Sequence, residues 1–244
     1  MERHRQVVIG IDLAKKVDRT CIAVTEQMGR EFVCGDLGRL PQGLDYGEQA
    51  RRIGRTYHQT VAVLAAANEK DARRARGGFF RAPYMDPPPE VDAAASVWCV
   101  IDASGVGEAV IDGVREYCGI PESHVLGIQI TGGVSHKFRL GDKNGSVSKQ
   151  FLISQLRRLT GFDPPLLKLP RGSEAKALRE ELENFEYNIT DSAHPQWGAV
   201  QGKHDDMIIA LALSTLPGGL PVYHGGSESY IDRSPAKTTI RIEE

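Results

Sequence analysis

The sequence Val8-Ile9-Gly10-Ile11-Asp12 lies in a run of mainly β-branched residues, 6–13, that predicts a strand. Side chains alternate between the two faces of a strand, so Asp12 shares a face with Val8 and Gly10, and the two isoleucines face the other way. Because glycine has no side chain, Gly10 is expected to leave room beside the carboxylate. We therefore expect the first strand to be largely apolar and to end in an acid.

The residues around this strand predict a mixed sheet. The run 20–25 is a second strand, and the short loop 14–19 before it indicates an antiparallel hairpin with the first. The run 96–101 is continuously apolar, which is typical of a buried central strand. Further strands are expected at 31–37 and 125–130, short edge strands at 187–190 and 199–201, a hairpin or loop at 131–145, and helices at 46–67, 108–118, 148–159, 173–185 and 203–216. This alternation predicts an α/β fold, a mixed sheet with helices on both faces.

Composition excludes several classes of protein. In 244 residues, 41% are hydrophobic and 25% are charged, which excludes wholesale disorder. A net charge of −2 excludes a uniformly basic nucleic-acid coat but not a local basic groove. The four cysteines form no Cys-x-x-Cys pair, so structural zinc and a dense disulfide framework are not expected. The apolar run 207–213 is too short to span a bilayer, and the charged N-terminus does not read as a signal peptide, so we expect a cytoplasmic protein with no membrane partner.

Two stretches depart from regular patterning. Residues 68–95 contain Gly77-Gly78 and three prolines at 87–89, and we expect them to form an exposed insertion. Residues 217–244 are rich in glycine, proline and serine and are expected to be a mobile tail. The expected domain therefore covers residues 1–216.

Acidic residues stand where the most apolar elements end or begin. Asp102 ends the strand at 96–101, Asp205 and Asp206 open the apolar helix, and Asp18 follows Asp12 across the hairpin loop. Taken singly, each reads as a turn or helix-capping residue. Jointly, they lie where α/β folds keep their sites, at the carboxyl ends of central strands. Converging carboxylates repel one another and favour a hard cation, which indicates Mg²⁺ or Mn²⁺.

Three motifs follow one another along residues 6–216: Ile-Gly-Ile-Asp at 9–12, Ile-Asp-Ala-Ser-Gly-Val-Gly at 101–107 and His-Asp-Asp at 204–206. In order and spacing they resemble the nuclease domain of the terminase large subunit, the DNA-packaging protein of tailed phages. The resemblance implies a ribonuclease H-like fold that carries a two-metal nuclease. It assigns the metal-binding acids as Asp12, Asp102 and Asp206, with Asp205 and Asp18 as auxiliary acids.

The resemblance also implies an activity and its setting. A viral protein of this kind is a Mg²⁺- or Mn²⁺-dependent endonuclease that cleaves double-stranded DNA during genome packaging in the host cytoplasm. Its partners would be a separate packaging ATPase, a small terminase subunit and a portal. A packaging motor is not expected in this chain, because the sequence has no phosphate-binding loop: the nearest stretch, 141–146, has the wrong spacing.

The chemistry fits these residue types without the resemblance. Phosphodiester hydrolysis needs an activated water and a stabilised leaving oxygen, and two metal ions ~4 Å apart supply both. We expect Asp12 to bridge the two ions, with Asp102 and Asp206 on either side. His204 either orients a ligand or water, or is a solvent-facing residue at the helix start.

A basic stretch is the candidate DNA-binding surface. Residues 134–158 hold six basic residues against the single acid Asp142. Basic side chains beside an acid cluster can follow DNA phosphates, although a solvated loop and helix face would look the same. The expected DNA contacts are Lys137, Arg139, Lys143, Lys149 and Arg157. The acidic stretch 173–186 is expected to face away, and little sequence specificity is expected.

Other functions remain open. A Gly-Ile-Asp strand and an Asp before a glycine turn also occur in the sugar-kinase and actin ATPase class, although such proteins need two lobes and give the His-Asp-Asp helix no role. Other ribonuclease H-like nucleases, such as junction resolvases, share the same acids. A dinucleotide-binding loop at Gly105-x-Gly107 is disfavoured because Val110 stands where the third glycine is needed. A structural packaging subunit with a vestigial site is the non-enzymatic alternative.

Overall fold

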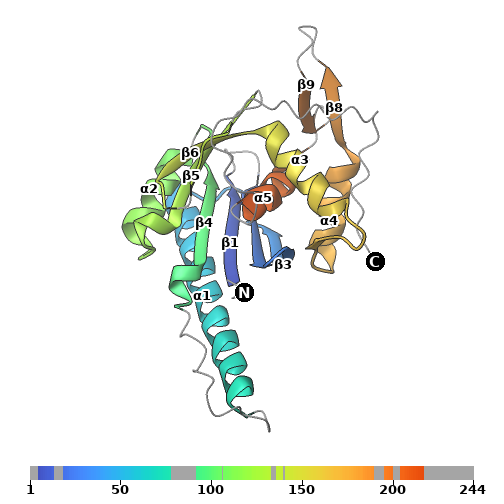
Figure 1. The fold of residues 1–244 in the computed structure, drawn as a ribbon. Coiled ribbons are helices and arrows are strands. Elements are labelled where there is room, and N and C mark those ends of the chain that lie inside the picture. The colour runs from blue at the N-terminus through green and yellow to red at the C-terminus, as the bar shows by residue number, and fades with distance from the viewer. Residues whose placement is uncertain are drawn as a thin grey trace.

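A mixed seven-stranded sheet forms the centre of the molecule in the computed structural model, which describes residues 5–13, 19–77, 92–105, 107–132, 136–139, 141–189, 195–199 and 204–216 (Figure 1). The strand order is β6-β5-β4-β1-β2-β3-β7. The strands are β1 (Arg5–Asp12), β2 (Cys21–Met28), β3 (Glu31–Arg39), β4 (Val97–Asp102), β5 (Val125–Thr131), β6 (Asn144–Ser148) and β7 (Leu167–Lys168). β2 pairs antiparallel with β1 and β3, as the hairpin prediction requires, and all other neighbours pair in parallel.

Helices cover both faces of this sheet. The α-helices are α1 (Tyr46–Gly77), α2 (Gly107–Tyr117), α3 (Lys149–Thr160), α4 (Ser173–Glu183) and α5 (Asp206–Thr215), and Ala94–Ser96 and Glu122–His124 form short 3-10 helices. α1 and α2 pack on one face, while α3, α4 and α5 gather on the other (Figure 1). The predicted α/β class, with a mixed sheet and helices on both faces, is confirmed.

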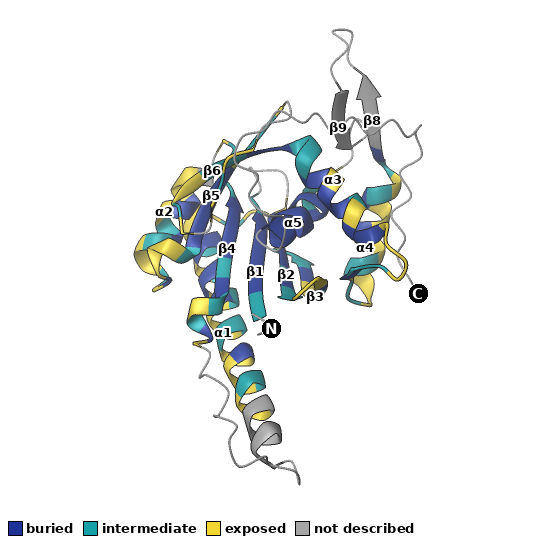
Figure 2. Ribbon diagram, in the orientation of Figure 1, coloured by how far each residue is buried: buried dark blue, intermediate teal, exposed yellow. Residues whose placement is uncertain are grey.

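The alternation along β1 divides the core in two. Val7, Ile9 and Ile11 belong to the core under α1 and α2, whereas Val8 belongs to the core under α5. Figure 2 shows β1, β4 and α5 almost entirely buried at the centre of the molecule. Asp12 therefore emerges on the α5 face, as the sequence pattern predicts.

Gly10 makes room for helix α5 and not, as expected, for the Asp12 carboxylate. A Cβ atom built on Gly10 would lie 2.2 Å from the carbonyl oxygen of Ala210 and 2.3 Å from the amide nitrogen of Ser214, both in α5. The space beside Gly10 is thus filled by the backbone of α5 and is not left open next to the Asp12 carboxylate. Because Gly10 has no side chain, the backbone of α5 packs directly against β1.

The main differences from prediction concern short or polar strands. The sequence 131–145 predicts a hairpin or loop, and Lys137 does bridge antiparallel to Ser146, but Asn144–Ser148 also forms the parallel edge strand β6, which was not expected. The expected edge strands near 187–201 are instead β8 (Phe185–Ile189) and β9 (Pro195–Ala199), which form a separate antiparallel pair. Polar sequence in β6 and a length of two residues in β7 give no apolar pattern to detect.

The stretch 68–95 is helical at its start. α1 continues through Gly77, because the residues before Gly77-Gly78 are good helix formers and contain no proline. Residues 78–91 and the tail 217–244 lie outside the described residues. Within the described residues, no helix is both long and apolar enough to cross a membrane.

Candidate active site

Two acids end neighbouring parallel strands of the sheet. Ile11 of β1 pairs with Ile101 of β4, and Asp12 and Asp102 are the next residue of each strand. Side chains at equivalent positions of adjacent parallel strands share a face and stand about 4.8 Å apart along the hydrogen-bonding direction. Asp12 and Asp102 are therefore neighbours on the face that α5 covers.

The first turn of α5 brings two more acids to this place. The helix starts at Asp206, with Asp205 as its N-cap residue, and its close approach to Gly10 aligns it along β1. The Asp205 side chain makes no capping hydrogen bond to the helix backbone. Its Oδ2 atom instead lies 2.5 Å from the Nζ atom of Lys149, the first residue of α3.

The charges of these residues act on one another. The pKa of the Asp12 carboxyl is raised well above its ordinary value, first by burial and then by the negative charges of Asp102, Asp206 and Asp205, while Lys149 opposes the rise. The four acids and the lysine thus form one electrostatic cluster, which we call the acid cluster. Its excess negative charge favours a bound cation.

The donor set of the acid cluster fits a hard divalent cation such as Mg²⁺ or Mn²⁺, because all four acids offer carboxylate oxygens. In the part of the chain that the structure describes, however, no three acidic, histidine or cysteine side chains already stand close enough to hold one ion. The carboxylates would have to turn toward one another to bind it. Lys149 supplies a single positive charge at the same place.

A backbone contact orients Asp102. One oxygen of Asp102 accepts a hydrogen bond from the backbone amide of Ser104 at 2.8 Å, in the manner of a turn residue. The Ser104 hydroxyl accepts in turn from the amide of Ile130 in β5 at 3.1 Å.

His204 is exposed, and its Nδ1 atom lies 3.8 Å from Oδ2 of Asp206. Asp18 lies outside the described residues.

Glu181 is a site residue that the sequence analysis missed. Its carboxylate is buried and accepts hydrogen bonds from the backbone amides of Met207 and Ile208 at the start of α5. Burial raises the pKa of the Glu181 carboxyl, and the hydrogen bond from Arg39 opposes that rise. The acidic stretch 173–186 was expected to face away as a whole, and for Glu181 this is wrong. The available signal was its position three residues after Leu178, on the apolar stripe of α4.

A buried thiol, that of Cys21, lies between residues of this site. Cys21 pairs with Asp12 across β1 and β2 and with Arg39 across β2 and β3. Burial raises the pKa of the Cys21 thiol, and the charges of Asp206, Glu181 and Asp12 raise it further. Glu181 thus stands beside the acid cluster.

The expected DNA-binding residues do not form a single patch. Lys137, Arg139 and Lys143 are exposed next to the β5–β6 edge, where Arg139 pairs with Asp142 at 3.3 Å and Lys143 pairs with Glu122 at 2.5 Å. Lys149 points into the acid cluster. Arg157 lies in the last turn of α3, about 12 Å along the helix axis from Lys149.

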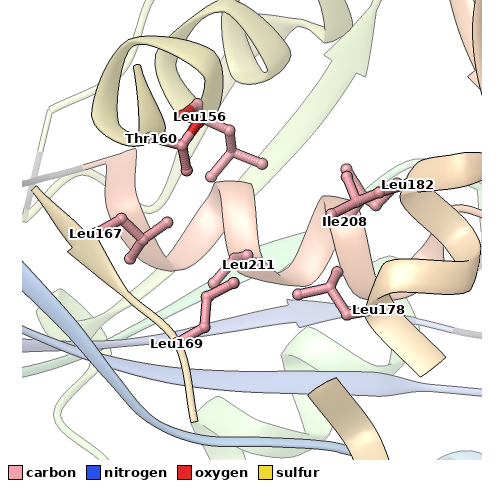
Figure 3. A pocket seen from close by; sticks show the side chains of 8 residues that line it. All are labelled: Leu156, Thr160, Leu167, Leu169, Leu178, Leu182, Ile208 and Leu211. Carbon is pink, nitrogen blue, oxygen red and sulfur yellow. Dashed lines mark hydrogen bonds between the residues drawn. The ribbon is translucent and has the colours of Figure 1, made fainter. Parts of the chain in front are cut away.

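An apolar pocket lies between α3, α4, α5 and the chain around β7 (Figure 3). Its lining consists of Leu156, Thr160, Leu167, Leu169, Leu178, Leu182, Ile208 and Leu211. The Thr160 hydroxyl donates to the carbonyl of Leu156, so the pocket offers no free group for chemistry. The acid cluster, in contrast, brings several ionisable side chains together.

A mixed sheet with acids at the ends of its first and fourth strands, and with an acidic helix start packed beside them, has the ribonuclease H-like fold. Among solved structures, the chain is similar to the large terminase nuclease from thermophilic phage G20c. With bound magnesium, that structure gives a TM-score of 0.52 and 22% identity over 87% of this chain and 81% of that chain, and the cobalt-bound form gives the same values. The large terminase nuclease domain of Thermus phage P74-26 gives a TM-score of 0.51 and 21% identity over 92% of this chain and 87% of that chain.

These likenesses confirm the predicted ribonuclease H-like fold and the resemblance to large terminase nuclease domains. At this identity they concern the fold. No protein-family model and no curated protein sequence matches the chain.

Proposed function

We propose that this chain is a Mg²⁺- or Mn²⁺-dependent endonuclease that cleaves double-stranded DNA during viral genome packaging, as the nuclease of a terminase large subunit. The observation that carries the proposal is the meeting of Asp12 and Asp102, at the ends of two adjacent parallel strands, with the acidic start of α5. The similar phage nucleases whose structures contain magnesium or cobalt support the use of a divalent metal.

Asp12, Asp102 and Asp206 are the residues that would hold two metal ions, with Asp205 and Asp18 as auxiliary acids. Bound ions of this kind supply an activated water and neutralise the leaving oxygen in phosphodiester hydrolysis. Asp12, on which the charges of Asp102, Asp206 and Asp205 all act, is suited to bridging. Lys149 holds Asp205 in place, and His204 borders Asp206 and can orient its carboxylate.

The exposed basic residues Lys137, Arg139 and Lys143 would bind DNA phosphates along the β6 edge of the sheet, and Arg157 would extend the track along α3. Such contacts position the duplex without reading its sequence. Lys149 forms an ion pair with Asp205, and its positive charge would lie where the scissile phosphate arrives.

The proposed partners and setting follow from the same activity. A separate packaging ATPase would move the DNA, and a small terminase subunit and a portal would complete the assembly in the cytoplasm of an infected host. The exposed cations near the β5–β6 edge are where this chain would meet the duplex.

The test is plasmid cleavage by the purified chain. Supercoiled DNA should be nicked or linearised with Mn²⁺ or Mg²⁺, remain intact in EDTA, and be cut equally with and without ATP. Branched and linear duplexes tested side by side would separate a packaging nuclease from a junction resolvase. Metal-dependent ATP hydrolysis without DNA cleavage would contradict the proposal and favour the sugar-kinase and actin class.

A further inference from the structure

The start of α5 is capped by a residue from another helix. The first amides of an α-helix have no partner within the helix, and the N-cap side chain usually accepts from the second or third residue. Here these residues are Met207 and Ile208, and their amides donate to Oε2 of Glu181, at 2.9 and 3.2 Å. Glu181 thus takes the place that Asp205 would ordinarily fill.

We propose that Glu181 is a positioning residue of the metal site: by capping α5 from α4, it lets the carboxylates of Asp205 and Asp206 face Asp12 and Asp102. Asp205 is among the best N-cap residue types, yet its side chain makes no capping bond and pairs with Lys149 instead. The inference rests on the proposed function, in which these carboxylates bind divalent metal.

Arg39 fixes the orientation of Glu181. Its Nη2 atom lies 2.6 Å from Oε1 of Glu181, so one carboxylate oxygen is held by the arginine and the other by the helix amides. The Glu181 side chain is only 5% exposed, and the arginine charge compensates the buried carboxylate. Arg39 ends β3, so this arrangement joins the sheet, α4 and the start of α5.

Removing the Glu181 carboxylate should redirect Asp205. The amides of Met207 and Ile208 would lack their acceptor in a buried place, and the carboxylate of Asp205 stands at the N-cap position, from which a side chain ordinarily accepts from these two amides. If Asp205 turned to cap the helix, it would leave Lys149 and withdraw from the acid cluster. The expected consequence is weaker metal binding by a fold that is otherwise intact.

Mn²⁺ binding to the full chain tests this directly, measured by calorimetric titration without DNA. Outer residues that orient metal ligands typically change affinity 10- to 100-fold. We expect a change of about that size for Glu181→Ala and a smaller one for Glu181→Gln, whose amide oxygen can still accept from the helix. Glu180→Ala is the matched control, because Glu180 is the adjacent, exposed glutamate of the same helix, and it should bind Mn²⁺ as the wild type does.

A purely structural role would give a different pattern. Glu181→Ala would then melt at a lower temperature but keep the wild-type Mn²⁺ affinity, and this result would overturn the inference. If Glu181→Ala does not fold, Glu181→Met decides, because methionine keeps the volume of the side chain but has no oxygen to accept from the amides of Met207 and Ile208. Its control is Glu180→Met, and equal Mn²⁺ affinity in these two variants would be equally contrary. Absence of Mn²⁺ binding in the wild type would contradict the proposed function itself, so the two failures are distinguishable.

Discussion

The amide nitrogen of Ser214 in α5 lies only 2.3 Å from the point where a Cβ atom on Gly10 of β1 would stand. The two backbones meet because residue 10 has no side chain, and the Ser214 hydroxyl reaches past β1 to bond Thr25 of β2 at 2.7 Å. This contact sets the height of α5 above the sheet. It therefore sets the distance between the start of the helix and Asp12.

Gly10→Ala should push α5 away from β1. Both contacting atoms belong to the helix backbone and cannot swing aside, so we expect a loss of about 1–3 kcal/mol or more in the free energy of unfolding, together with loss of DNA cleavage. Urea unfolding curves and plasmid assays measure the two effects. Gly38→Ala in β3 is the control, because nothing lies within 4 Å of a Cβ atom there. Equal stability of the two variants would contradict the close packing.

The sequence predicted the central part of the sheet because apolar side chains follow one another there with a clear period. β1 and β4 are recognisable from their own residues, and so are the acids that end them. The pairing of Ile11 with Ile101 was not predictable from either strand alone, because parallel register depends on helices and loops between them. The meeting of Asp12 with Asp102 was therefore an inference from fold class.

Lys149 and Glu181 show why the rest of the site was not predicted. Lys149 is placed by β6, whose sequence Asn-Gly-Ser-Val-Ser has no strand-like apolar pattern. Glu181 is held by hydrogen bonds from backbone amides of α5, a helix that follows later in the chain. Every residue type except proline has such an amide, so the sequence does not indicate which amides a side chain will bind. Residue types alone predict a DNA contact for the lysine, which stays a prediction, and give no sign of its ion pair with Asp205 or of the burial of the glutamate.

We expect Asp102 and Asp206 to be required for DNA cleavage, and we expect their negative charges to lower the stability of the metal-free fold. Asp102→Asn keeps an oxygen that can accept from Ser104, and like Asp206→Asn it removes one negative charge from the acid cluster. Both variants should fail to cut DNA and, in EDTA, should melt at or above the wild-type temperature. Mn²⁺ should raise the melting temperature of the wild type, since a ligand of the folded state stabilises it, and should do much less for the variants. Lower melting with retained cleavage would show that the site is wrongly assigned.

Stability of the metal-free protein should fall as pH rises through the titration of Asp12. The folded pKa of Asp12 is raised well above its ordinary value, so between the unfolded pKa, about 3.9, and the folded one the folded state binds more protons than the unfolded chain. The free energy of unfolding then decreases with increasing pH over that window. Asp12→Asn should remove this part of the slope, as measured by urea unfolding in EDTA at a series of pH values. Parallel curves for the variant and the wild type would mean that Asp12 is not under this repulsion.

The exposed cations at the β5–β6 edge should govern DNA affinity without affecting the metal site. Each phosphate contact contributes about 0.9 to the slope of log affinity against log salt concentration. Replacing Lys137, Arg139 and Lys143 with alanine should therefore weaken DNA binding and flatten that slope, while Mn²⁺ affinity stays at the wild-type value. Lys168→Ala is a suitable control, because this exposed lysine pairs with Glu31 at the opposite edge of the sheet. Fluorescence anisotropy with a labelled duplex at several salt concentrations measures both quantities. A triple variant with the wild-type slope would place the DNA elsewhere on the surface.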